Sequence, residues 1–132
     1  MNVGIDSLRK SLAEFDSKHK RQLMADLTSL LEVLTLEEGM WPSYWTNGGL
    51  LRRYADEPCV YVFLDHSGEM LYIGQTKCLG NRFGAHLSKG GLGKEKAGSI
   101  AFIPVPRECW FEILAIEGYL IDKLILHKNK PA

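Results

Sequence analysis

The N-terminal part of the chain has a helical pattern of apolar positions. Apolar residues, most of them leucine, recur every three or four positions through residues 5–37, which is the spacing of one helix face. This predicts a long helix or a helix pair, with Asp6 as its N-cap and Gly39 as its C-cap. The polar residues 16–20 are either a break between two helices or the solvent-facing side of one. The pattern leaves both alternatives open.

The period changes in the second half of the chain. Short β-branched and aromatic runs at 59–64 and 70–73 flank the sequence Asp65-His66-Ser67-Gly68. This pattern predicts a β-hairpin, and Asp at the first and Gly at the fourth turn position favour a type I turn. A third extended run, residues 100–105, is bounded by prolines, which predicts a short strand or one at a sheet edge.

Helical and loop patterns complete the order of elements. Residues 79–87 suggest a helix, the glycine-rich 90–93 a loop, and 107–127 a second helix. The order is helix, strand, strand, helix, strand, helix, so we expect an α+β fold with helices flanking a small, mostly antiparallel three-stranded sheet. We expect residues 1–50 to be an N-terminal helical extension packed on the core, and residues 57–132 to be the main domain.

Composition narrows the class of protein. The 132 residues are 45% hydrophobic and 24% charged, as in one soluble domain with a full core. The longest uncharged run, residues 39–51, is too short and polar to span a bilayer. Charged residues also interrupt the apolar start that a secretory signal needs. Cys59, Cys78 and Cys109 form no C-x-x-C pair, which favours a reduced, cytoplasmic protein over a disulfide or zinc framework.

Charge is balanced overall but uneven along the chain. Sixteen basic and sixteen acidic residues cancel. Residues 1–40 hold five basic against seven acidic residues, a net charge of −2, whereas residues 76–107 hold six basic against one acidic, a net charge of +5. A basic stretch attracts phosphates, although a solvated lysine-rich loop is the commoner origin of such a stretch.

Glu117 is the most informative single position. At 100° per residue its helix face also carries six apolar residues: Trp110, Ile113, Leu114, Leu120, Ile121 and Leu124. A carboxylate in a buried stripe must be protonated, paired or bound to a metal, because an uncompensated buried charge is costly. A structural salt bridge to a buried arginine is the simpler explanation for an isolated observation.

Four other side chains are candidates with ordinary structural alternatives. Arg82 and His86 are four residues apart and share one face of the expected helix. Tyr61 and Tyr72 belong to the two hairpin strands, where tyrosines are usually packing residues. A two-residue loop would place the tyrosines directly opposite each other, whereas a bulge at Gly68 would put them on different faces.

Taken together these residues resemble a known family. Cys59-Val60-Tyr61, an eleven-residue step to Tyr72-Ile73-Gly74, Arg82 ten residues later and a helical Glu117 are similar to the ordered motifs of the GIY-YIG nucleases. The resemblance covers about residues 59–131 and identifies 57–132 as a GIY-YIG-like nuclease domain. It implies catalytic roles for five residues: Tyr61, Tyr72, Arg82, His86 and Glu117.

The resemblance also implies the chemistry of the site. Glu117 would hold one Mg²⁺, with Mn²⁺ as a possible substitute, to stabilise charge on the leaving oxygen. Arg82 would donate to the phosphate in the transition state. Tyr61 would deprotonate a water, with Tyr72 as its partner or the alternative base, and His86 would relay the proton.

The substrate implied by the resemblance is nucleic acid, most simply DNA, hydrolysed by a metal-dependent endonuclease. The residues expected to contact substrate are Gly74, Gln75, Lys77 and Lys89. Gln75 stands where many relatives carry Lys, and Lys77 could partly replace that charge. The alternative is a non-catalytic nucleic-acid or protein-binding module on the same fold, which Gln75 and the neutral net charge would suit. An enzyme acting on another phosphodiester is a third possibility. The N-terminal helices could form a homodimer interface, although packing on the core is favoured because their leucine stripe must be buried.

Overall fold

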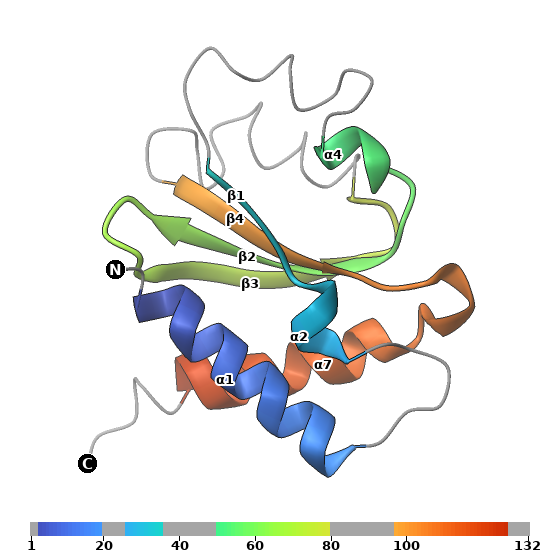
Figure 1. Ribbon diagram of the computed structural model, residues 1–132, viewed down its shortest axis with the longest axis horizontal. Helices are drawn as coiled ribbons and strands as arrows, with labels where there is room; N and C mark the ends of the chain where they lie inside the picture. The colour runs from blue at the N-terminus through green and yellow to red at the C-terminus, as the bar shows by residue number, and fades with distance from the viewer. Residues whose placement is uncertain (1–2, 20–25, 36–49, 80–96, 127–132) are drawn as a thin grey trace.

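A four-stranded antiparallel sheet with helices on both sides forms the protein (Figure 1). The computed structural model describes residues 3–19, 26–35, 50–79 and 97–126. The strands are β1 (Glu32–Thr35), β2 (Cys59–Asp65), β3 (Met70–Thr76) and β4 (Ala97–Pro104), in the sheet order β1-β4-β2-β3. The helices are α1 (Val3–Lys18), α2 (Leu27–Leu30), α4 (Leu50–Arg53) and α7 (Glu112–Ile121). A 3-10 turn (Arg107–Cys109) precedes α7 and a π-helical turn (Asp122–Leu126) follows it.

The α+β class is confirmed, but the expected three-stranded sheet is wrong. Strand β1 is the additional strand, and it arises from a segment predicted to be helical. Residues Glu32 to Thr35 pair antiparallel with β4 along their whole length. A segment of four residues, two of them β-branched, is compatible with the apolar spacing of a helix or of a strand. Pairing with the available edge of β4 therefore outweighed the helical spacing of the sequence around it.

Strand β4 is central, which corrects the prediction of an edge strand. It pairs with β1 on one side and with β2 on the other. Pro104 is tolerated because it is the last residue of the strand, where a missing backbone donor interrupts no continuing ladder. The proline therefore indicates where this strand ends, and not whether the strand is central or at the edge of the sheet.

The N-terminal helix begins earlier than predicted. It starts at Val3, so Asp6 lies within the first turn and is not the N-cap. The helix ends at Lys18, which decides between the two alternatives for residues 16–20 in favour of a break. Gly39, the expected helix 79–87 beyond its first residue, and the loop 90–93 lie outside the described residues.

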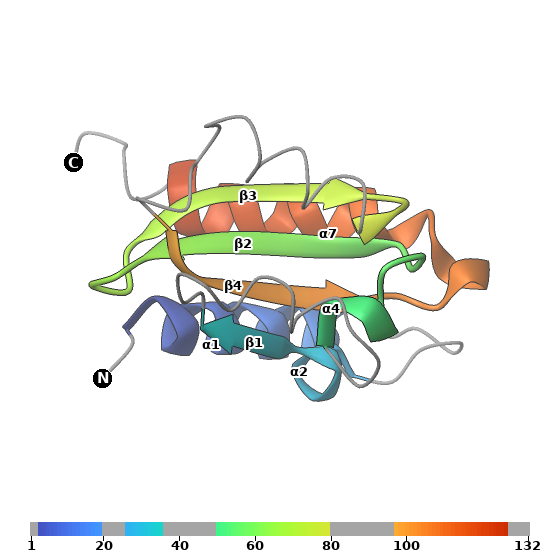
Figure 2. The same cartoon turned by 90° about the horizontal axis from the view of Figure 1, so that it is seen from above.

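One aliphatic core lies between the sheet and its two longest helices. Figures 1 and 2 show α1 and α7 side by side on one side of the sheet, with α4 on the other. Alternate residues of β2, with Ile73 of β3, pack in one cluster with the leucine stripe of α1 and with Ile113, Ile116 and Leu120 of α7. We call this side of the sheet the helix face. The apolar stripe of α1 is therefore buried against the sheet of its own chain.

The three cysteines are free thiols. Cys59 and Cys109 are buried and Cys78 is partly buried. Burial raises the pKa of the Cys59 thiol, with a further contribution from Cys78, so Cys59 stays protonated in the core. In the described ranges, no helix is both long enough and apolar enough to cross a membrane.

Candidate active site

The two motif tyrosines meet on the sheet face opposite the helix face. Tyr61 of β2 lies opposite Gly74 of β3, and Phe63 lies opposite Tyr72. Cross-strand partners share a face, so Tyr61 and Tyr72 are diagonal neighbours on one surface. Their ring centroids are 6.0 Å apart with the planes at 32°. We call this side of the sheet the tyrosine face.

The hairpin reaches this arrangement by two register shifts rather than by either alternative expected from the sequence. The turn has the predicted hydrogen bond from Gly68 N–H to the Asp65 carbonyl, at 3.1 Å, and Gly68 has a φ of 92°. The Asp65 carboxylate accepts from the Ser67 hydroxyl and from two backbone N–H groups, and these hydrogen bonds lower its pKa. A second shift between Phe63 and Leu64 then returns both tyrosines to one face.

Gly74 has a direct steric role in the site. A Cβ at this position would lie 2.6 Å from the Tyr61 hydroxyl oxygen and 2.7 Å from a ring carbon of Tyr72. Only glycine therefore lets the Tyr61 phenol cross the backbone of β3 beside Tyr72. The glycine of the second motif and the tyrosine of the first therefore contact each other directly.

The two tyrosines differ in their access to solvent. Tyr61 is 2% exposed and packs edge-on against Phe63, with ring centroids 5.8 Å apart. Tyr72, on the edge strand, is 39% exposed. A water or a phosphate can therefore reach Tyr72 directly, whereas Tyr61 can position Tyr72 from within the protein.

Glu117 lies at the border of the α7 stripe rather than inside it. The buried residues of the helix are Ile113, Ile116 and Leu120, whereas Leu114 is 58% exposed and Trp110, just before the helix, is 43% exposed. This corrects the expectation that all six apolar neighbours of Glu117 are buried. Glu117 itself is half-buried, and desolvation raises the pKa of its carboxyl.

Glu117 is the candidate side chain that could hold a divalent cation. Within the described ranges Glu117 makes no hydrogen bond or ion pair, and desolvation is the cause of its pKa shift. In the same ranges no group of three or more His, Cys, Asp or Glu side chains forms a cage for a metal. Mg²⁺ suits a single carboxylate because it keeps several waters and takes further oxygen atoms from a phosphate.

The expected phosphate contacts, Gln75 and Lys77, lie on the same side of β3 as α7. Strand alternation puts Gln75 on the side of Ile73, opposite Tyr72, and Lys77 directly follows the last residue of the strand. The Lys77 ammonium lies 4.3 Å from the centroid of the Trp110 ring, a cation–π contact. Trp110 lies just before the start of α7, the helix that carries Glu117.

The candidate residues therefore approach the edge strand β3 from two sides. The tyrosines lie on one face of the strand, and Glu117 lies on the helix that packs against the other face. Arg82, His86 and Lys89 lie outside the described residues. Sequence reasoning missed the exposure of Trp110, which was predicted to lie in the buried stripe. The sequence did indicate that some of these residues are exposed, because the apolar residues around α7 are more than one helix face can hold.

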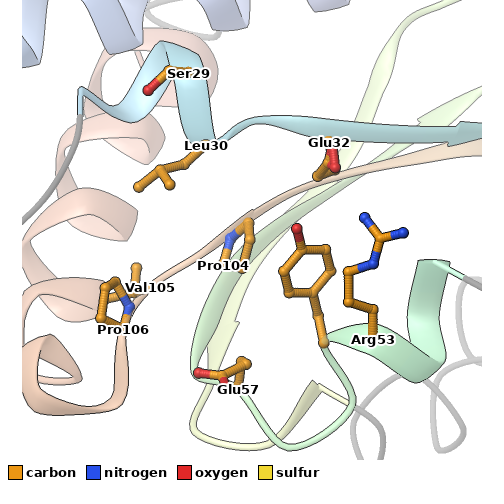
Figure 3. A pocket seen from close by; sticks show the side chains of 9 residues that line it. Ser29, Leu30, Glu32, Arg53, Glu57, Pro104, Val105 and Pro106 are labelled. Atoms are coloured by element: carbon orange, nitrogen blue, oxygen red, sulfur yellow. The ribbon is translucent and has the colours of Figure 1, made fainter.

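A separate pocket lies away from these residues. It is about 340 Å³ in volume and lies between the end of β4, the α2–β1 segment and α4. Glu32 from β1 and Arg53 from α4 are among the residues that line it, as Figure 3 shows. Its lining includes none of the candidate site residues, so the pocket is not part of the candidate active site.

Comparison with known proteins agrees with the geometry. The family model of the GIY-YIG catalytic domain matches residues 57–129, more than half of the chain. The match includes both tyrosine motifs and Glu117. Neither a curated protein nor a solved structure matches the chain. Since the matched segment contains the hairpin whose tyrosine and glycine motifs meet, the chain belongs to the GIY-YIG family, whose members are nucleases that act on nucleic acid.

Proposed function

We propose that this protein is a metal-dependent endonuclease that hydrolyses phosphodiester bonds in DNA at the exposed edge of β3. The observation that carries the proposal is the pairing of Tyr61 and Tyr72 across Gly74. Packing alone does not need a glycine that admits one phenol beside another. A site that holds two phenolic hydroxyls close to the strand edge does need such a glycine.

The difference in exposure divides the work between the tyrosines. Tyr72 contacts the attacking water because its side chain reaches solvent, and the buried Tyr61 positions the Tyr72 ring. A free phenol has a pKa of about 10 and is a weak base at neutral pH. The proton of the water therefore needs an onward acceptor, and His86 is the residue we assign to that relay.

The charged residues stabilise the phosphate. Arg82 donates to the non-bridging oxygens through its planar guanidinium, which fits a phosphate better than a lysine does. Lys77 adds a positive charge at the same strand edge, held in place by Trp110. Glu117 would hold Mg²⁺ or Mn²⁺, which would supply charge stabilisation at the leaving oxygen.

Cleavage of DNA by the purified chain tests the proposal. Supercoiled plasmid, branched DNA and single-stranded DNA are incubated with Mg²⁺, with Mn²⁺ and with EDTA. We expect cleavage with either metal and none with EDTA. Glu117→Gln should abolish cleavage but retain DNA binding that weakens as salt rises. Glu108→Gln, an exposed carboxylate just before the same helix, is the matched control and should cleave normally.

Three outcomes would contradict the proposal in whole or in part. If the folded protein binds DNA but cuts none of the substrates with either metal, it is a binding module on the nuclease fold. If Glu117→Gln and the wild type cleave equally, another group holds the metal. Cleavage of a small phosphodiester but of no DNA would redirect the assignment to a different substrate.

A further inference from the structure

The pocket at the end of β4 is built by two parts of the chain. Glu57 and residues 104–106 belong to the segment that matches the catalytic domain. The other lining residues, from α2, β1 and the α4 region, precede that segment. The matched domain alone therefore does not close this pocket. Its volume of about 340 Å³ lies at the lower end of ligand pockets, which suits one ring system rather than an extended molecule.

The pocket lies on the tyrosine face of the sheet. Glu32 of β1 pairs with Phe102 of β4, and Phe102 pairs with Tyr61 of β2. Cross-strand partners share a face, so the Glu32 side chain is on the same side as the two motif tyrosines. Tyr54 packs edge-on against Phe102, with ring centroids 5.8 Å apart. A strand of nucleic acid bound at Tyr72 can therefore reach the pocket along one face of the sheet.

Arg53 brings hydrogen-bond donors to the lining. Its guanidinium carbon lies 5.9 Å from the centroid of the Tyr54 ring, a cation–π contact that does not use its N–H groups. Figure 3 shows Arg53, Glu32 and Glu57 around the same pocket. In the described parts of the chain, the side chains of these three residues make no hydrogen bond or ion pair. The pocket thus offers a ligand both a donor group and carboxylate acceptors.

We propose that this pocket binds an unpaired guanine base of the substrate strand, an inference that rests on the proposed action on DNA. The two carboxylates and one guanidinium of the lining sum to a net charge of −1. That charge disfavours a phosphate group, and the guanidinium disfavours an organic cation. A neutral ring that has both donors and acceptors is therefore the ligand that these charges favour.

Guanine is the base whose hydrogen-bonding groups match the lining. Its adjacent N1–H and N2–H donors fit the two oxygen atoms of one carboxylate, and its O6 and N7 acceptors fit a guanidinium. We assign the carboxylate to Glu32, because pairing with β4 fixes its backbone, and the guanidinium to Arg53. The Tyr54 ring and Pro104 supply the flat apolar surface on which a base stacks.

The sheet sets the distance between the guanine and the cleaved phosphate. Strands β1 and β3 are three strand spacings apart, or about 14 Å. A stacked strand advances about 3.4 Å per nucleotide, so the guanine should lie about four nucleotides from the phosphate at Tyr72. Arg52 is exposed on α4 and is not a lining residue, so it is placed to contact phosphates that stay outside the pocket.

Binding of single-stranded oligonucleotides in EDTA tests the proposal without any cleavage. A labelled strand of thymines with one central guanine is compared with the same strand of thymines alone, by fluorescence anisotropy with the full chain. We expect the guanine strand to bind roughly 10-fold more tightly, as for one bidentate contact. Glu32→Gln and Arg53→Gln should each remove most of that difference. Both should still bind the thymine strand, which shows that the variants are folded.

Two matched variants and one competitor sharpen the test. Glu108→Gln removes an exposed carboxylate outside the lining and should leave the difference between the strands unchanged. Arg52→Gln should weaken the binding of both strands equally, because a phosphate contact carries no base preference. Guanosine monophosphate should displace the guanine strand only far above the dissociation constant of that strand, because one nucleotide lacks the other phosphate contacts.

Three results would overturn the proposal. The first is equal affinity of the folded wild type for the two strands, and the second is a guanine preference that persists in both Glu32→Gln and Arg53→Gln. The third is binding of guanosine monophosphate as tight as that of the guanine strand, which would assign the pocket to a free nucleotide. A guanine preference without cleavage of any substrate would support this subsite while contradicting the nuclease activity, so the two proposals fail separately.

Discussion

The side chains of β2 are buried on both faces of the sheet, but the two faces consist of different kinds of residue. The helix face is aliphatic and is covered by α1 and α7. The tyrosine face carries Tyr61, Phe63 and Phe102, all nearly inaccessible, and ends at the exposed Tyr72 on β3. Aliphatic packing fills space and tolerates exchange of similar side chains. An aromatic pair that depends on one glycine instead fixes the position of two hydroxyl groups. Stability should therefore depend mainly on the helix face, and cleavage on the tyrosine face.

The largest effect should come from the exposed hydroxyl of the tyrosine face. Tyr72→Phe removes one oxygen atom from a side chain that is 39% exposed. We expect cleavage to fall by roughly 10²–10⁴-fold, the usual contribution of a general acid–base group. The free energy of unfolding should change by less than about 0.5 kcal/mol. Plasmid cleavage and chemical denaturation measure the two effects. Tyr119→Phe, on α7, is the control, and equal cleavage by both variants would argue against a role for Tyr72.

The next effect should fall on stability alone and should come from the helix face. Leu12 of α1 is fully buried in the aliphatic core. Leu12→Ala should lower the free energy of unfolding by about 2–5 kcal/mol. Cleavage per folded molecule should stay close to that of the wild type. Leu114→Ala, on the exposed side of α7, should cost less than about 0.5 kcal/mol at low protein concentration. Urea unfolding of both variants makes this comparison, which fails if the two costs are similar.

A third change should affect both properties, because it alters the contact that joins the two tyrosines. In Gly74→Ala the new methyl group would overlap the Tyr61 hydroxyl and the Tyr72 ring. We expect a loss of about 1–3 kcal/mol in stability, as for other overpacked sites, together with reduced cleavage. The Tyr61→Phe background removes the nearest oxygen, so the stability cost of Gly74→Ala should shrink there. Purely additive costs in this double-mutant cycle would contradict the contact.

The smallest effect concerns the pH dependence of stability. Desolvation raises the pKa of Glu117 in the folded protein, so the folded state binds this proton more tightly than the unfolded state does. Glu117 should therefore make stability fall as pH rises from the unfolded-state pKa through the folded-state pKa. Glu117→Gln should remove that part of the decline. The measurement is the difference in unfolding midpoint between the two proteins across the acidic range, and a difference that does not vary with pH would exclude the effect. Asp65, whose pKa is lowered, contributes the opposite trend in both proteins.

The hairpin illustrates how far local sequence can predict this site. Asp65 and Gly68 identified the turn, and the β-branched runs identified the two strands. The register between Tyr61 and Tyr72 was not predictable, because a second shift between Phe63 and Leu64 follows the bulge at the turn. Each one-residue shift moves a side chain to the other face. Which face the tyrosines share thus depends on pairing along the whole ladder.

The placement of β1, β4 and Glu117 required the tertiary structure for a related reason. Four residues from Glu32 to Thr35 satisfy either a helical or a strand pattern, and the open edge of β4 selected the strand. Glu117 was identifiable as a carboxylate among apolar residues, but which of those residues are buried depends on where α7 rests against β2 and β3.

Residue types, turn chemistry and the order of motifs are local properties, and from them followed the α+β class, the hairpin and the membership of a nuclease family. The number and order of strands, the shared face of Tyr61 and Tyr72 and the exposed side of α7 followed only from the assembled molecule. The physical reason is that burial and strand pairing act between residues distant in sequence, and their free energies outweigh the small preferences of short segments.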